Sequence, residues 1–227
     1  MNLLAIDTAR GDGSVALLCD GSPGGFVALG EAPGFGEVLF GAIERLLAGG
    51  GLALRDLDGF AAATGPGSFT GIRVGLVAAK AFAEVHAKPV VGVSSLQALA
   101  RSAPGSARRV ALLDARRGEV FAGLYGARCE RLVPETLGAF AALPSRMVPP
   151  GALFVANEPQ LFEPGGALAG AAGRPLHRGP STLAREVAAI AAGEIAAGRG
   201  GRPEEVEANY IRRPSAVPPR WAQAARR

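Results

Sequence analysis

The sequence is poor in the side chains that build metal centres and disulfide frameworks. Its 227 residues include two cysteines and two histidines. Cys19 and Cys129 lie far apart, and neither has a second cysteine or histidine at metal-ligand spacing. They therefore indicate two reduced thiols. His86 and His177 are equally isolated, whereas zinc and iron sites need grouped ligands. We expect no metal site.

The sequence also lacks an unbroken apolar run long enough to cross a bilayer. Its first residues, MNLLAIDTARG, reach Asp7 after a few apolar positions and carry no basic leader, unlike a signal peptide. Hydrophobic residues still make up 48% of the chain, too many for a disordered protein. We expect a cytoplasmic protein with no membrane contact, folded as one large domain or two small ones.

Lysine is scarce, and the positive charge is unevenly placed. Lys80 and Lys88 are the two lysines, and the last 16 residues, RRPSAVPPRWAQAARR, hold five arginines and no acid. The preceding body is therefore close to neutral and does not predict a broad basic face. The arginine-rich tail can contact RNA or an acidic partner, or it can be a solvated terminus.

Hydrophobic periodicity and turn residues divide the chain into alternating strands and helices. Glycines 49 to 51 stop the first apolar helix pattern. The helix near the C-terminus has Ser181 or Thr182 as its expected cap. The pattern predicts strands at residues 2–8, 14–20, 24–30, 57–64, 88–94 and 152–157, a strand-turn-strand unit at 109–126, and helices at 36–48, 71–86, 95–103 and 181–198.

A β-turn-β unit occurs twice. RVALLDARRGEVFAGLYG repeats the pattern of NLLAIDTARGDGSVALLCDG, with Asp7 and Asp114 closing the first strand and Gly11 and Gly118 in the turns. Two such units, each opening an α/β segment, predict two α/β lobes of duplicated design. We expect a lobe at 1–104, a smaller one at 105–200, and a C-terminal segment with the basic tail at 201–227.

The stretch GPGSFTGIRVG, residues 65–75, is open to three interpretations. It lacks the lysine of a Walker loop, since Ile72 stands there, and its glycines nearly match a dinucleotide-binding pattern. The amides of residues 67–71 at a helix N-terminus can still bind an anion. Ser68 lacks the second glycine of a nucleophile elbow.

The third interpretation concerns the helix that follows this loop. Gly71, Gly75 and Ala79 recur every four residues, with Ala78 and Phe82 alongside. Glycine within a helix costs about 1 kcal/mol against alanine, so two in one stripe indicate close approach of another backbone. That backbone can belong to the chain's own sheet or to another chain.

Several motifs, in order and at the expected separations, closely resemble the TsaB family. They are LLAIDTA, GPGSFTGIRVG, AAKAFAE, GVSSLQALA, DARRGEVF and NYIRR. TsaB proteins act in bacterial tRNA threonylcarbamoyladenosine biosynthesis and are non-catalytic paralogues of TsaD in the glycoprotease-like group. The resemblance covers nearly the whole chain and is strongest over residues 1–125. It implies an α/β fold of the actin-like, Hsp70-like nucleotidase (ASKHA, ribonuclease H-like) class, with two lobes.

The resemblance also implies a function. TsaB-like proteins bind and activate TsaD, and the ATPase TsaE joins the larger complex. That assembly transfers a threonylcarbamoyl group from threonylcarbamoyl-adenylate to the adenosine beside the anticodon of tRNAs that read codons beginning with A. The chain would be an accessory subunit rather than an enzyme. It would form a heterodimer with TsaD, meet tRNA through the complex, and form a homodimer when TsaD is absent.

The site residues that the resemblance implies fall into two groups. Helices 36–48 and 71–86 would face the partner, with Gly71 and Gly75 at the closest approach. The expected interface residues are Phe35, Glu37, Leu39, Phe40, Ile43, Gly71, Val74, Gly75, Ala78, Ala79 and Phe82. The loop leading into the second helix, with possible anion-binding groups, contributes Gly65, Gly67, Ser68, Thr70 and Arg73. Phe35 and Gly36 stand where many family members have His and Ser, so the chain departs from the family pattern at the expected interface.

Actin-like ATPases wrap phosphate with an Asp-x-Gly turn that also holds a hydroxyl residue. Here Thr8 and Ala9 follow Asp7, and Ala115 and Arg116 follow Asp114. Both phosphate turns are therefore degenerate. We expect no cofactor and weak or absent ATP or ADP binding in the isolated protein.

Two other classes of function stay open at this stage. One is an actin-fold enzyme, either a phosphotransferase or a glycoprotease-like peptidase, which would need a competent phosphate turn or an activated nucleophile. The other is a direct tRNA-binding module that uses the arginine tail.

Overall fold

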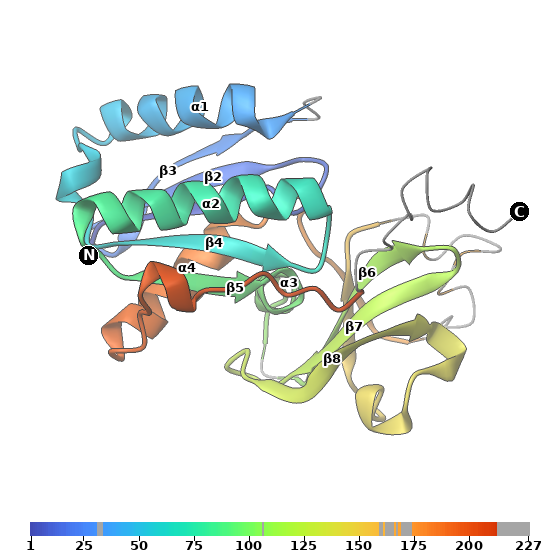
Figure 1. The fold of residues 1–227 in the computed structure, drawn as a ribbon. Helices are drawn as coiled ribbons and strands as arrows, with labels where there is room; N and C mark the ends of the chain where they lie inside the picture. The colour runs from blue at the N-terminus through green and yellow to red at the C-terminus, as the bar shows by residue number, and fades with distance from the viewer. Residues whose placement is uncertain are drawn as a thin grey trace, which may run out of the picture.

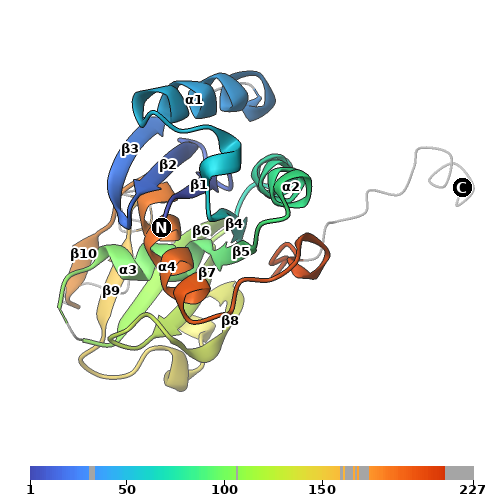
Figure 2. The same ribbon diagram turned by 90° about the vertical axis from the view of Figure 1, so that its left-hand side faces the viewer.

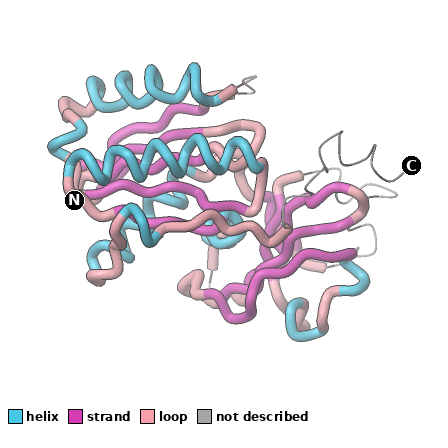
Figure 3. Tube along the Cα trace, viewed as in Figure 1, coloured by secondary structure: helices cyan, strands magenta, loops and turns pink. Residues whose placement is uncertain are grey.

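The computed structural model describes residues 1–30, 34–105, 107–158, 161, 166, 168 and 174–212. These residues form two five-stranded sheets (Figures 1 and 3). The first sheet has the order β3-β2-β1-β4-β5, from β1 (Leu3–Asp7), β2 (Ser14–Cys19), β3 (Ser22–Ala28), β4 (Gly59–Gly65) and β5 (Val90–Ser94). The second has the order β8-β7-β6-β9-β10, from β6 (Arg109–Arg116), β7 (Glu119–Tyr125), β8 (Arg131–Ala139), β9 (Leu153–Ala156) and β10 (Leu176–Arg178).

The two sheets share one topology. In each, the first three strands form an antiparallel meander, the fourth pairs in parallel with the first, and the fifth pairs in parallel with the fourth. Each hairpin that opens a sheet is one of the two repeated units of the sequence. The duplicated, hairpin-led α/β architecture is therefore confirmed.

Within the described residues, four α-helices form layers around the sheets. They are α1 (Phe35–Gly49), α2 (Phe69–His86), α3 (Ser95–Ser102) and α4 (Ala184–Ala196). Helices α1 and α2 cover the outer face of the first sheet, whereas α3 and α4 lie between the two sheets (Figure 2). Alternation along β1 explains the two cores, because Leu4 and Ile6 pack toward α1 and α2 while Leu3 and Ala5 pack toward α4.

The two middle helices are exchanged between the sheets. Helix α3 follows the first sheet in sequence but packs mainly against β6 and β7 of the second. Helix α4 follows the second sheet but packs mainly against β1, β2 and β4 of the first. The predicted divisions at residues 104 and 200 stay predictions, and this exchange carries a helix across the first of them.

The start of α4 differs from the prediction. Neither Ser181 nor Thr182 caps the helix, whose N-cap residue is Leu183. Instead, the Asp7 carboxylate accepts the Leu183 N–H at 3.2 Å, and the Ser14 Oγ accepts the Ala184 N–H at 3.2 Å. The first hairpin thus supplies the cap, which follows from the packing of α4 on the first sheet.

Residues 206–212, here called the C-terminal strap, form hydrogen bonds with elements of both sheets and with α2. Lys80 Nζ donates to the Val206 carbonyl at 3.0 Å, and the Asn209 N–H donates to the Thr64 carbonyl at 2.8 Å. Toward the second sheet, Asn209 Nδ2 donates to Glu135 at 2.6 Å, and Arg212 pairs with Glu119. The arginines after position 212, on which the tail hypothesis depends, lie outside the described residues.

None of the described helices combines the length and apolar character that a membrane span requires.

Candidate functional site

The outward faces of α1 and α2 carry a row of exposed apolar side chains. Phe40 is 51% exposed, Val77 is 63% exposed and Val85 is 77% exposed. Phe40 also meets Phe82 edge to face, with 6.2 Å between ring centroids, so the two helices present one surface. We call this surface the apolar strip and define it as Val38, Phe40, Val74, Val77, Phe82 and Val85.

The small-residue stripe of α2 faces inward, and its assignment to a partner interface is corrected. A Cβ atom on Gly75 would collide with Thr8 Oγ1 and lie 3.0 Å from Ile6 Cγ2, and one on Gly71 would collide with the Thr8 carbonyl. The backbone that the stripe approaches is therefore β1 of the same chain. Four other residues assigned to the interface are also buried in the chain's own core: Leu39, Ile43, Ala78 and Ala79.

The remaining interface residues lie at or near the surface. Glu37 and Phe40 are exposed, and Phe35, Val74 and Phe82 are half-buried. Sequence reasoning missed Val38, Val77 and Val85. The signal was present, because Val77, Ala81 and Val85 repeat every four residues on the side of α2 opposite its glycines. A helix that is apolar on two sides has two surfaces to cover.

The loop before α2 is held by the first hairpin. Ser68 Oγ caps α2 by accepting the Gly71 N–H at 3.2 Å. The Ser68 N–H donates to the Ala9 carbonyl at 2.7 Å, and Thr8 Oγ1 donates to the Gly71 carbonyl at 2.7 Å. Gly67 packs closely on Ala9, whereas Thr70 and Arg73 are exposed. Much of the predicted anion-binding loop is thus engaged within the protein.

Ser68 also has no neighbouring histidine on α2 that could serve as its base. His86 stands at the opposite end of this helix, about 27 Å away at 1.5 Å per residue. Its ring stacks on Phe60, with 6.4 Å between centroids. Among the residues that the structure describes, no three His, Cys, Asp or Glu side chains lie close enough together to hold a metal ion.

A cavity of about 670 Å³ separates the first hairpin turn from the second sheet. Its lining includes residues 9–11, 66–69, 113–116 and 209–212. Of the two turn aspartates, Asp114 lines this cavity, whereas Asp7 is buried and is not part of the lining.

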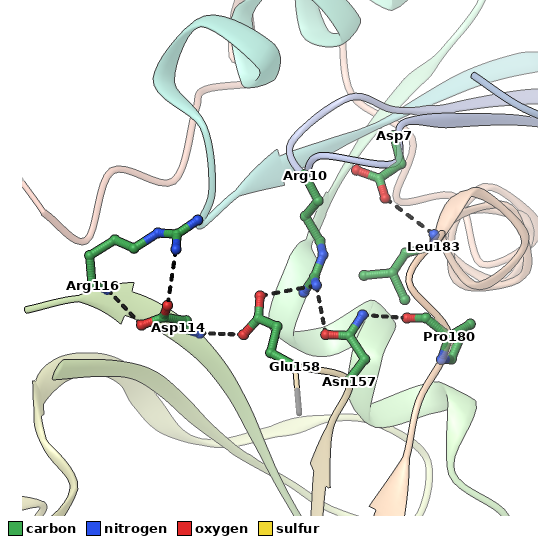
Figure 4. A network of polar contacts seen from close by, with 8 residues as sticks. All are labelled: Asp7, Arg10, Asp114, Arg116, Asn157, Glu158, Pro180 and Leu183. Carbon is green, nitrogen blue, oxygen red and sulfur yellow. Dashed lines mark hydrogen bonds and ion pairs between the residues drawn. The ribbon is translucent and has the colours of Figure 1, made fainter. Parts of the chain in front are cut away.

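Both aspartates are bonded to protein groups (Figure 4). One oxygen of Asp7 accepts the Ala9 N–H at 3.1 Å, and the other accepts the Leu183 N–H. Burial raises the pKa of the Asp7 carboxyl, against the opposing effects of these N–H groups and of Arg10. Asp114 accepts the Arg116 N–H at 2.7 Å and pairs with its guanidinium at 3.5 Å.

Arg10 bridges the two sides of the cleft. Its Nη2 donates to Asn157 Oδ1 at 2.6 Å and to Glu158 at 3.1 Å. Glu158 also accepts the Asp114 N–H at 2.6 Å, and Asn157 donates to the Pro180 carbonyl at 2.6 Å. Figure 4 shows this single network running from one sheet to the other. Sequence reasoning missed Arg10, although a guanidinium inside a degenerate phosphate turn was a usable signal.

Comparisons with known proteins agree on one relationship. The family model described as TsaD, tRNA N6-adenosine threonylcarbamoyltransferase, matches residues 21–164. A protein of Escherichia coli K12, named tRNA threonylcarbamoyladenosine biosynthesis protein TsaB, is 38% identical over 128 residues, 55% of either chain. The Bacillus subtilis protein of the same name is 33% identical over 139 residues, 60% of this chain and 61% of that one. The chain thus spans little more than half the length of these curated relatives.

A solved structure extends the likeness to almost the whole chain. YeaZ from Pseudomonas aeruginosa is 26% identical, with a TM-score of 0.74, and the match covers 92% of this chain and 99% of that one.

Proposed function

The chain belongs to the TsaD family and is similar to relatives named TsaB, and from that premise we propose that it is an accessory subunit in tRNA threonylcarbamoyladenosine biosynthesis. In this proposal it binds and activates TsaD, which carries out the threonylcarbamoyl transfer. TsaE and tRNA join the larger complex, and the transfer takes place in the cytoplasm.

The observation that carries this proposal is the apolar strip. Burying apolar surface is favourable by about 25 cal/mol per Å² removed from water. A contiguous apolar patch on a soluble protein is therefore typical of an interaction site. The aromatic pair Phe40 and Phe82 provides the kind of anchor that dominates interface energies. Flanking exposed charges, such as Glu37 and Glu84, supply a polar rim.

The family match also supports the choice of partner. The TsaD family model aligns with residues 21–164, a segment that contains both α1 and α2. TsaD therefore carries equivalent helices, and pairing of equivalent faces gives a helical bundle. The same self-complementary face would join two copies of this chain when TsaD is absent.

A non-catalytic role agrees with the chemistry of the cleft. The oxygens of Asp7 and Asp114 accept hydrogen bonds from the protein itself, and Arg10 crosses the space between the two turns. We therefore propose weak or absent ATP and ADP binding. An actin-fold phosphotransferase or a peptidase ranks second, because Asp7 and Ser68 would both have to leave their present bonds first.

Co-purification with TsaD tests the proposal. We expect wild type to form a one-to-one complex and Val77→Glu/Val85→Glu to remain folded but unbound, because two charges would be buried in the interface. Leu132→Glu is the matched control, since Leu132 is 44% exposed on β8 of the other sheet. A strip variant that still binds TsaD, or a wild type that does not, contradicts the proposal.

A further inference from the structure

An aromatic and arginine stack stands at the edge of the cavity. Phe69 is exposed in the first turn of α2, and the Arg73 guanidinium carbon lies 3.8 Å from its ring centroid. Tyr210 of the strap packs on Phe69, with 5.1 Å between centroids, and its hydroxyl accepts the Arg73 Nε–H at 3.2 Å. Phe69 and Tyr210 also line the cavity.

Two adjacent arginines of the second sheet stand at the cavity: Arg116 lines it, and Arg117 follows Arg116 in the chain. Arg116 and Arg117 form the turn between β6 and β7, both are exposed, and both have left-handed backbones with φ of 64° and 59°. Asparagine or glycine adopts this conformation at lower cost than arginine does. Arginine at these two positions therefore does not stabilise the turn, and its presence points to a role for the two side chains.

The charges around the cavity leave positive groups available. Arg10, Arg116 and Arg212 line it, and each is paired with a carboxylate: Glu158, Asp114 and Glu119. Arg73 and Arg117 have no ion pair with another described residue. In the Arg116 pair, the guanidinium is 82% exposed and lies 3.5 Å from the mostly buried Asp114 carboxylate, so water screens the arginine's charge. An incoming phosphate can compete for it.

We propose that this rim, defined as Phe69, Arg73, Arg116, Arg117 and Tyr210, binds unpaired RNA. Aromatic rings and guanidinium planes stack on bases that are free of a duplex, and neighbouring arginines contact the backbone phosphates. The cavity behind the rim has the volume of a small-molecule site and can take one extruded base. In a base-paired RNA duplex the faces of the bases are already stacked on one another, so they cannot stack on Phe69 or Tyr210.

This proposal rests on the proposed function and adds to it, since it names the part of the RNA that this chain contacts. The rim lies at the N-terminal end of α2, whereas the apolar strip begins at Val74, next to Arg73, and runs to Val85, about 18 Å farther along the helix. In this proposal RNA and a protein partner therefore occupy adjoining surfaces of α2.

Fluorescence anisotropy of the full chain with a labelled RNA stem-loop tests it. Arg73→Ala/Arg116→Ala/Arg117→Ala removes three phosphate contacts, so we expect an affinity loss of at least about tenfold. The slope of log K against log salt should flatten by about 2, at about 0.7 per contact with a single strand. Phe69→Ala should weaken binding at least about fivefold through lost stacking. Arg45→Ala/Arg55→Ala/Arg128→Ala removes the same charge from exposed positions elsewhere and should bind like wild type.

Several results would overturn the proposal. They are no binding of the stem-loop by wild type, equal losses in the rim and control variants, and equal affinity for a fully paired duplex. Loss of binding on deleting residues 214–227, with the rim intact, would assign RNA contact to the tail instead. TsaD co-purification of the same variants separates the two hypotheses. If TsaD binding persists while RNA affinity is unchanged, the rim proposal alone fails, and if wild type does not bind TsaD, the proposed function fails.

Discussion

Gly75 shows how a single missing side chain sets the distance between α2 and β1. A Cβ at this position would meet Thr8 Oγ1 and Ile6 Cγ2, both fully enclosed in the core. Gly193 in α4 has no atom within 4 Å of the position that its Cβ would take. The same substitution should therefore act in opposite directions at these two helical glycines.

We predict that Gly75→Ala lowers the free energy of unfolding by about 1 to 3 kcal/mol, because overpacking outweighs the gain in helix propensity. Gly193→Ala should raise it by up to about 1 kcal/mol. Urea denaturation of both variants measures this. Equal stabilisation by the two substitutions would show that α2 does not pack closely on β1.

Asp7 makes a second prediction at the residue scale, on pH dependence. Burial raises the pKa of its carboxyl above the ordinary value of 3.8 in the folded protein. The folded state therefore holds this proton more tightly than the unfolded state does. The stability that the group contributes is full below the ordinary pKa and is lost as the pH rises through the raised one.

The measurement is the difference in unfolding free energy between wild type and Asp7→Asn across the pH range above about 4. We expect wild type to lose stability relative to the variant as the pH rises. Glu186 is present in both proteins; its pKa is raised mainly by burial and in smaller part by the Asp7 charge, so it contributes to the difference only through that coupling. If wild type instead gains stability relative to Asp7→Asn as the pH rises, the hydrogen bonds to the ionised carboxylate outweigh the effect of its burial.

At the scale of elements, α4 belongs to the first sheet although it lies about 90 residues beyond it in sequence. Its buried face, with Val187, Ala188 and Ala191, packs on Leu3 and Ala5 of β1. A fragment that ends before this helix would leave that face of the sheet in water.

We predict that residues 1–104 alone do not unfold cooperatively, whereas the same fragment with residues 181–200 attached through a flexible linker does. Circular dichroism during thermal melting distinguishes the two. The comparison holds the sheet, α1 and α2 constant, so only the covering helix changes. A cooperative transition in the shorter fragment would show that α4 is dispensable to the first sheet.

Elements with clear periodicity were the ones that sequence could predict. The helix at 71–86 and the strand at 57–64 follow directly from their apolar patterns, and the structure places α2 and β4 there. Strands β8 and β10 were not identified, since β8 contains Pro134 and β10 has three residues. Their pairing with neighbours, rather than their own composition, makes them strands.

The direction in which α2 faces could not be predicted in the same way. Glycines spaced four apart report close approach but not the identity of the neighbour. Gly75 meets Thr8, which lies 67 positions earlier, and that contact exists only once β1 and β4 pair. The Arg10 network and the α4 cap share this dependence on contacts between distant segments.

At the scale of the whole molecule, Arg10 links the first hairpin to Asn157 and Glu158 beside the second sheet. We predict that Arg10→Ala increases amide hydrogen exchange at residues 9–11 and at Asp114, whose N–H shares Glu158 with this arginine. The loss of stability should be about 1 to 3 kcal/mol, because a hydrogen-bonded, mostly buried charge pair is broken. Arg55→Ala, which breaks an exposed pair with Asp56, should change neither quantity. Unchanged exchange in Arg10→Ala would mean that the strap and the middle helices hold the two sheets without it.

The exchange of helices also has a consequence for synthesis on the ribosome. Strand β5 of the first sheet ends at Ser94, but the helix that covers its inner face ends at Ala196. At roughly 5 to 20 residues per second, translation takes about 5 to 20 s to bridge that interval. Throughout that time Leu3 and Ala5 stay uncovered by their helix. One face of the first sheet is therefore exposed to solvent in every round of translation, and the synthesis of α4 determines when the first 94 residues can finish folding.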